Sequence, residues 1–145
     1  MSVANKFCLP NYPRNYKLVF TNGCFDFGLT RGHIECLTFA KAQGDKLIVG
    51  LNSDSSIKRL KGNNRPILPL EDRMHIMAAL ECVDYVYSFE EDSPLELIKK
   101  LKVDVIVKGS DYQKEKVVGY GLAEVIICPL VKCISTTEKI QLCIS

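Results

Sequence analysis

The sequence has no tryptophan, only two histidines and no long apolar run. Without about 18 consecutive apolar residues there is no candidate transmembrane helix. Residues 1–13 are polar and contain prolines, which is not the pattern of a signal peptide. Two histidines argue against a structural zinc site. We therefore expect a cytoplasmic protein with no membrane partner and no metal-ligating residues of its own.

Charge and cysteine content exclude further classes of protein. The 19 basic and 17 acidic residues leave a formal net charge of +2, which gives little steering toward polyanions, so we expect no nucleic-acid partner. The seven cysteines are odd in number and form no Cys-x-x-Cys pair, which is typical of thiols in a reducing compartment. Cys24 is a candidate nucleophile, because a nearby helix start would lower the pKa of its thiol. The alternative is that it merely fits a tight turn.

Apolar runs alternate with amphipathic segments along the chain. The runs predict strands at 18–20, 47–51, 83–89, 103–107 and 125–128. Helices are predicted at 34–42, 54–62, 69–80, 94–101 and 135–142. Strands that are apolar on both faces belong in a parallel sheet covered by helices. We therefore expect one Rossmann-like α/β domain over 17–145, a three-layer αβα arrangement with a five-stranded, mostly parallel sheet, after an irregular N-terminal arm over 1–16.

Two coil-to-helix junctions are candidate phosphate-binding sites. The first, 21–33, connects an apolar strand to a helix and is rich in glycine, so a ligand can approach the main chain and the helix N-terminus, where His33 lies in the first turn. The second is Ser135-Thr136-Thr137, although a plain helix cap explains those hydroxyls equally well. The Gly-x-Gly-x-x-Gly fingerprint and the P-loop are both absent after the first strand, which disfavours hydride transfer and kinase chemistry.

Residues 21–33 resemble the signature of the nucleotidyltransferase superfamily that includes the cytidylyltransferases. In that signature a strand ends in Gly-x-Phe-Asp, as at 23–26, and a helix opens with His-x-Gly-His, which corresponds here to Thr30-Arg31-Gly32-His33. Thr30 replaces the first histidine, and Asp26 lies four residues before it where the family usually has three. Further matches make 17–141 similar to the adenylyltransferase domain of ADP-heptose synthase: 44–45, 52–54, 58–62, 65–66, 71–73, 88–92, 107–112 and 134–137.

The resemblance implies transfer of AMP from ATP to a sugar 1-phosphate of the heptose type, with release of pyrophosphate and with Mg²⁺ bound to the triphosphate. Such a reaction needs positioning and charge neutralisation rather than a covalent nucleophile. It also implies a homodimer. The implied catalytic residues are His33, Lys61 and Thr30. The implied nucleotide contacts are Thr21, Asn22, Gly23, Cys24, Phe25, Gly32, His33, Arg73, Lys108, Gly109, Asp111, Ser135, Thr136 and Thr137. The implied sugar-phosphate contacts are Asp26, Asn52, Asp54, Lys61 and Arg65.

Several of these residues have a plainer interpretation. His33 could satisfy a backbone group at the helix start, Asp26 could orient the loop by accepting backbone N–H bonds, and Lys108 could be a solvated surface cation, like Lys58 and Arg59. Tyr112 could touch the base or simply pack, and His75 is expected to be structural or exposed.

Two alternative functions stay open. One is a cytidylyltransferase that uses CTP and glycerol 3-phosphate or another small alcohol phosphate. The other is a nucleotide-binding protein with weakened catalysis, because a Thr30 hydroxyl cannot carry the charge of a histidine. Loss of one aimed donor costs about 10²–10³ in rate. The short segment 118–121 predicts an uncovered sheet flank or room for a partner subunit.

Overall fold

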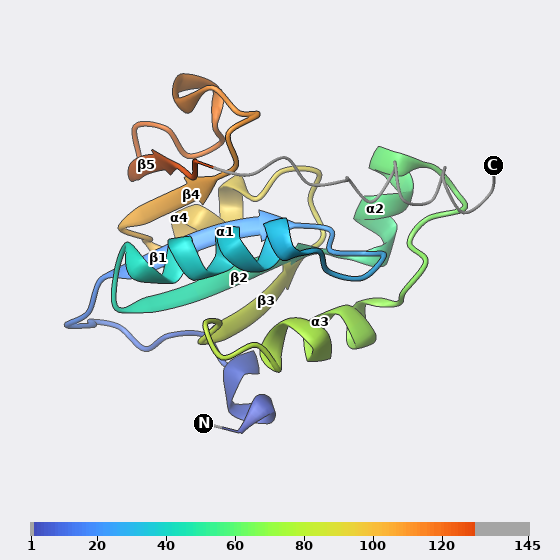
Figure 1. Ribbon diagram of the computed structural model, residues 1–145, viewed down its shortest axis with the longest axis horizontal. Helices are drawn as coiled ribbons and strands as arrows, with labels where there is room; N and C mark the ends of the chain where they lie inside the picture. Colours follow the sequence, from blue (N-terminus) through green and yellow to red (C-terminus); the bar gives the residue numbers. More distant parts are fainter. Residues whose placement is uncertain (1, 130–145) are drawn as a thin grey trace.

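The computed structural model describes residues 2–129 and contains a five-stranded sheet with helices on both faces (Figure 1). The predicted final helix and Ser135–Thr137 lie outside the described residues. The strands are β1 (Leu18–Gly23), β2 (Lys46–Asn52), β3 (Tyr85–Phe89), β4 (Val105–Lys108) and β5 (Glu124–Ile127). They lie in the order β3-β2-β1-β4-β5, and every pair is parallel. The predicted Rossmann-like α/β class is confirmed.

Four helices connect the strands: α1 (Arg31–Ala42), α2 (Asp54–Lys61), α3 (Leu70–Ala78) and α4 (Leu95–Leu101). A 3₁₀ turn, η2 (Lys114–Lys116), precedes β5. Ser53 caps α2 by accepting a hydrogen bond from the backbone N–H of Ser56, as its sequence position predicts. The predicted start of α4 is one residue early, since Pro94 is the N-cap rather than the first helical residue. Within residues 2–129, no helix has the length and apolar character that a bilayer span requires.

The central strands β1, β2 and β4 are buried on both faces along most of their length, which explains why they are largely apolar. On one face Val19 packs in a core with Leu37 of α1 and Met77 of α3. On the other face Leu18 and Phe20 pack in a second core, which includes three residues of α4. Figure 1 accordingly shows α1 in front of the sheet and α4 behind it. Burial on both faces fixes the register of the strands, because a one-residue slip would exchange the two sets of side chains.

The N-terminal arm is not wholly irregular, which corrects the prediction for residues 1–16. A 3₁₀ helix, η1 (Val3–Phe7), packs beside α3 and β3. The ammonium of Lys6 donates to the carbonyl of Leu80 at 3.0 Å, and the Phe7 ring meets the His75 ring edge-on at 5.1 Å. Proline excludes regular helix around positions 10 and 13, but the segment before them is long enough for one 3₁₀ turn. His75 itself is exposed, as predicted.

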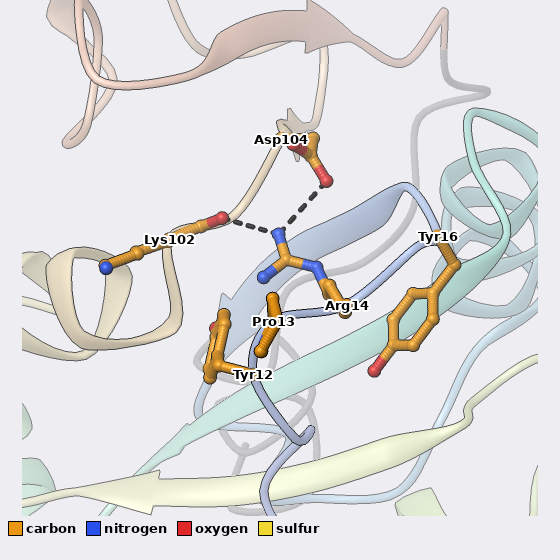
Figure 2. Close-up of a pocket in the computed structure, with 6 residues that line it drawn as sticks. All are labelled: Tyr12, Pro13, Arg14, Tyr16, Lys102 and Asp104. Atoms are coloured by element: carbon orange, nitrogen blue, oxygen red, sulfur yellow. Dashed lines mark hydrogen bonds and ion pairs between the residues drawn. The ribbon is translucent and has the colours of Figure 1, made fainter.

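Arg14 attaches the end of the arm to the amino edge of the sheet (Figure 2). Its guanidinium donates to the carbonyls of Leu101 and Lys102, at 3.2 and 2.5 Å, and to Asp104 Oδ2 at 3.0 Å. The same carboxylate oxygen accepts the backbone N–H of Leu18 at the start of β1. Because α4 ends in a left-handed residue at Lys102, Arg14 supplies donors for two of the carbonyls that the helix end leaves unpaired. A cavity of about 520 Å³ lies here, lined by Tyr12, Pro13, Arg14, Tyr16, Lys102 and Asp104.

We expect Arg14→Ala to lower the free energy of unfolding by about 1–3 kcal/mol, because the partly buried carbonyl of Leu101 loses its donor and Asp104 loses its ion-pair partner. Urea denaturation followed by circular dichroism measures this. Lys99→Ala, which removes an exposed ion pair with Glu96 on the same helix, is the control and should change stability by less than about 0.5 kcal/mol. Equal effects of the two substitutions would contradict the role given to Arg14.

Candidate active site

The parallel sheet brings the predicted site segments together at its carboxyl edge. The ends of β1 and β2 are adjacent, with Asn22 paired to Gly50 and Gly23 to Leu51. On the other side β1 pairs with β4, which ends at Lys108. The loop 24–30, the segment 52–54 and the segment 108–112 therefore meet where ligands bind in open α/β sheets. The cavity in Figure 2 lies at the opposite, amino edge of the sheet, so it is not the candidate active site.

The loop after β1 has an uncommon backbone. Phe25 has φ 47° and Gly28 has φ 72°, both in the left-handed region. A Cβ at Gly23 would lie 2.9 Å from Cε2 of the Phe25 ring, so glycine is needed there to seat this ring. The ring in turn meets His33 edge-on, with 5.6 Å between centroids. Within the described chain, Gly23 thus makes room for Phe25, whereas the sequence analysis expected it to make room for a ligand.

Thr30 and His33 form a capping box at the start of α1. Thr30 Oγ1 accepts the backbone N–H of His33 at 3.4 Å, and the backbone N–H of Thr30 donates to His33 Nδ1 at 3.1 Å. The plainer interpretation of His33, that it satisfies a backbone group, therefore holds for one ring nitrogen. A neutral ring whose Nδ1 accepts that bond carries its proton on Nε2. The capping box fixes both the orientation and the tautomer of the imidazole.

Lys108 is a partly buried cation at the end of β4. Its ammonium donates to the backbone carbonyl of Asn22 at 3.3 Å and lies 5.0 Å from the centroid of the Tyr112 ring. Burial lowers the pKa of Lys108 to about 8, although Cys36, Asp111 and Cys24 act in the opposite direction. It forms no ion pair with any residue of the described range. A desolvated positive charge without a carboxylate partner is one that a bound phosphate would neutralise.

Asn22, whose backbone carbonyl accepts from Lys108, also carries a buried polar side-chain atom. Its Oδ1 accepts no hydrogen bond from residues 2–129. Buried acceptors are nearly always paired, so this atom marks the end of β1 as a place where residues 2–129 supply no donor. The arrangement favours a ligand that carries both an anionic group and a hydrogen-bond donor.

Asp26 and Arg65, which the sequence predicts as sugar-phosphate contacts, form a buried ion pair. Arg65 Nε donates to Asp26 Oδ2 at 2.6 Å, and their side chains are 7% and 0% exposed. Asp26 also accepts the backbone N–H groups of Ile67 and Leu68, at 2.7 and 2.8 Å. The interpretation of Asp26 as a loop-orienting carboxylate agrees with this geometry. Neither side chain offers a surface to a ligand in this structure.

Arg73 is also buried, although the sequence analysis expected it to contact the nucleotide. Its side chain has no exposed surface and donates to the carbonyls of Leu68, Cys24 and Asn52, at 3.0, 3.1 and 2.8 Å, and to Asp54 Oδ1 at 2.7 Å. All of these acceptors belong to the protein. Arg73 therefore joins chain segments to one another instead of facing a ligand, and Asp54 is its carboxylate partner.

The remaining predicted residues divide into buried and accessible groups. Thr21 is buried in β1, Gly32 is buried in α1, and the Asn52 amide donates to Ser56 Oγ at 3.1 Å. Lys61 and Asp111 are exposed, and Gly109 is half-buried. Of the two basic residues with open roles, Arg59 pairs with Asp92 at 2.9 Å, which favours its surface role, and Lys58 is exposed. The accessible or half-buried candidates with an ionisable side chain therefore include His33, Lys61, Lys108 and Asp111.

Cys24 does not have the environment of a nucleophile. Burial raises the pKa of its thiol, although Lys61, Arg73 and Arg65 partly oppose this effect. Its sulfur lies 3.8 Å from Asn52 Oδ1 and donates to it. A raised pKa is the opposite of what the nucleophile hypothesis requires, so the turn-fitting interpretation is the one that the structure favours.

Glu90 organises the segment after β2, a role that was not predicted from the sequence. Glu90 Oε2 accepts from Ser53 Oγ at 2.9 Å and from Ser55 Oγ at 2.7 Å, and these bonds lower its pKa. The sequence alone does not predict these bonds, because Glu90 reaches the two serines only when the ends of the neighbouring strands β2 and β3 lie side by side.

Comparisons with known proteins show which family the chain belongs to. The model of the Cytidylyltransferase-like family matches residues 20–138. The chain is 53% identical over 131 residues to the Bifunctional protein HldE of a Nitratiruptor species, covering 90% of this chain and 28% of that protein. It is 58% identical over 108 residues to the Bifunctional protein HldE of Helicobacter pylori, covering 74% and 23%. The chain thus spans about a quarter of the length of these curated relatives.

A solved structure supports the same conclusion. The crystal structure of the lipopolysaccharide core biosynthesis protein from Thermoplasma volcanium superposes with a TM-score of 0.68 at 26% identity, covering 81% of this chain and all of that one. The chain belongs to the cytidylyltransferase-like family. The family resemblance identified at 21–33 is confirmed.

We expect affinity for ATP to fall as the pH rises from 7 to 9, because only protonated Lys108 attracts phosphate. With a pKa of about 8, about a tenth of the lysine is charged at pH 9, which predicts about tenfold weaker binding. Isothermal titration calorimetry at several pH values measures the effect. Lys108→Gln should bind ATP more weakly at pH 7 and lose most of the pH dependence. An identical pH profile in the variant would contradict this contact.

Proposed function

We propose that this chain transfers AMP from ATP to a sugar 1-phosphate of the heptose type and releases pyrophosphate. The observation that carries the proposal is the junction between β1 and α1, where a capping box orients His33 at a helix N-terminus beside the strand that ends at Lys108. Helix N-termini attract phosphate through unpaired N–H groups and the helix dipole. The similarity to HldE proteins and to a lipopolysaccharide core biosynthesis protein supports a sugar phosphate as acceptor.

In this proposal the sugar phosphate oxygen attacks the α-phosphorus of ATP in line, and the bond to the pyrophosphate oxygen breaks. His33, from its Nε2–H, and Lys61 donate to the phosphate oxygens that gain charge as pyrophosphate leaves. Lys108 neutralises phosphate charge at the end of β4, and Asn22 Oδ1 accepts a donor from the nucleotide. Asp111, Gly109 and Tyr112 line the nucleotide side. Thr30 acts through His33, which it holds in place.

Mg²⁺ would enter with the triphosphate, supplying charge neutralisation at the phosphates. The carboxylates near the loop fit this arrangement, because Asp26 is committed to Arg65 and two backbone N–H groups, and Asp54 accepts from Arg73. Phosphate oxygens and water are therefore the expected ligands. A cytoplasmic location and a homodimer stay predictions.

His33→Glu separates the chemical role of His33 from its capping role. Glutamate at the third helical position is a normal partner in a capping box, so the melting temperature should change little. An ionised carboxylate has no N–H to donate, and removing one aimed donor should lower the rate of pyrophosphate release by at least about 10²–10³. The assay contains Mg²⁺, ATP and heptose 1-phosphate. An unchanged rate in a folded variant would remove His33 from the mechanism, and no pyrophosphate from the wild type would contradict the proposed function.

The same assay discriminates between nucleotides and acceptors. We expect a higher kcat/KM with ATP and a sugar 1-phosphate than with CTP and glycerol 3-phosphate, and the reverse ranking would favour the cytidylyltransferase alternative. The weakened-catalysis alternative predicts a rise in melting temperature with ATP but no product. Because Thr30 caps α1, Thr30→His would restore the family histidine but would also remove a cap, at about 1 kcal/mol of stability. Its rate must therefore be measured well below its melting temperature.

A further inference from the structure

Lys61 is the last residue of α2 and lies along the chain between two ion pairs, one partly exposed and one buried. Asp54, the first residue of α2, pairs with Arg73 at 2.7 Å. Arg65, four residues after Lys61, pairs with Asp26 at 2.6 Å. Lys61 itself is exposed and forms no ion pair with any residue of the described range. Its own side chain is available to a ligand, while the chain on either side of it is fixed.

The first pair fixes the start of α2. Arg73 reaches Asp54 on α2, the carbonyl of Asn52 at the end of β2 and the carbonyl of Cys24 in the loop after β1. Its planar fork holds these three acceptors in fixed directions, which a lysine ammonium could not do. The orientation of α2 is therefore tied to the loop that carries the family signature.

The second pair fixes the chain after α2. Asp26 accepts from Arg65 and from the backbone N–H groups of Ile67 and Leu68. The carbonyl of Leu68 accepts from Arg73 Nε at 3.0 Å, which joins the two pairs into one network. Both ends of the segment that carries Lys61 are thereby tied to the loop after β1.

The position of Lys61 follows from these contacts, because the segment 54–65 is bound to the loop after β1 near both of its ends. The direction in which Lys61 shifts the pKa of the Cys24 thiol, downward, agrees with this placement. Ion pairs that are taken out of water are weak evidence for stability, because well-packed apolar residues often stabilise as well or better. A geometric role therefore explains better why an ion pair stands on each side of one exposed cation.

We propose that Asp54, Arg73, Asp26 and Arg65 form a positioning frame that holds the Lys61 ammonium against the loop after β1, where it binds a phosphate group. These four are positioning residues, and Lys61 is the contact. The inference rests on the proposed function, because it assumes that a polyphosphate occupies this loop.

A double-mutant cycle tests the frame without requiring turnover. Inorganic tripolyphosphate is the probe, and its affinity is measured by calorimetry for the wild type, Asp54→Asn, Lys61→Ala and the double variant. Lys61→Ala should weaken binding about tenfold or more, as expected for loss of a charged hydrogen bond. Asp54→Asn should weaken binding in the wild type but have no further effect once Lys61 is absent. Asp92→Asn is the matched control, because it breaks the exposed pair with Arg59 on the same helix and should not change affinity.

Several results of this cycle would overturn the positioning frame. Equal losses from Asp54→Asn with and without Lys61, no loss from Lys61→Ala, or no binding by the wild type would each overturn the frame. Asp54→Glu, which keeps the charge but lengthens the side chain, replaces Asp54→Asn in the cycle if the latter does not fold, and it should show the same dependence on Lys61. Coupled binding without pyrophosphate release from ATP and a sugar phosphate would contradict the proposed function while leaving the frame intact.

Discussion

The side chain of Arg73 joins the chain segments that meet at the carboxyl edge of the sheet. It is buried, and the acceptors that surround it come from the loop after β1, the end of β2, the start of α2 and the segment before α3. A buried guanidinium persists only where it is paired and its donors are satisfied. This requirement fixes the relative positions of segments that are far apart in sequence, and the geometry of the candidate active site follows from it.

The burial of each cation indicates whether its charge is used within the protein or is available to a ligand. The net charge of +2 gives the molecule no large positive field, so attraction for a triphosphate must be local. Arg65 and Arg73 are used within the protein, while Lys61 and Lys108 lack carboxylate partners in the described chain. In the proposed reaction these lysines, together with His33 and the N-terminus of α1, would supply the charge neutralisation that nucleotidyl transfer requires. This chemistry needs aimed donors rather than a nucleophile, which agrees with the raised pKa of Cys24.

The sequence was most informative where the physics is local. Strands that are apolar on both faces predict the buried parallel sheet, and the glycine-rich junction at 21–33 predicts the position of the candidate site. The roles of Arg65 and Arg73 could not be predicted, because their carboxylate partners, Asp26 and Asp54, are brought to them only by the fold. The capping role of His33 was predicted only as an alternative to phosphate contact, because the usual capping-box pattern has Glu or Gln at that position.

The central claim is that a nucleotide triphosphate binds at the carboxyl edge of the sheet between α1 and the end of β4. The most direct test is a crystal structure of the protein with Mg²⁺ and α,β-methylene ATP, an analogue that resists transfer. The account predicts phosphate oxygens within hydrogen-bond distance of the His33 imidazole and the Lys108 ammonium. A nucleotide bound elsewhere, such as in the cavity beside Tyr12 and Arg14, with both of these side chains out of contact, would contradict it.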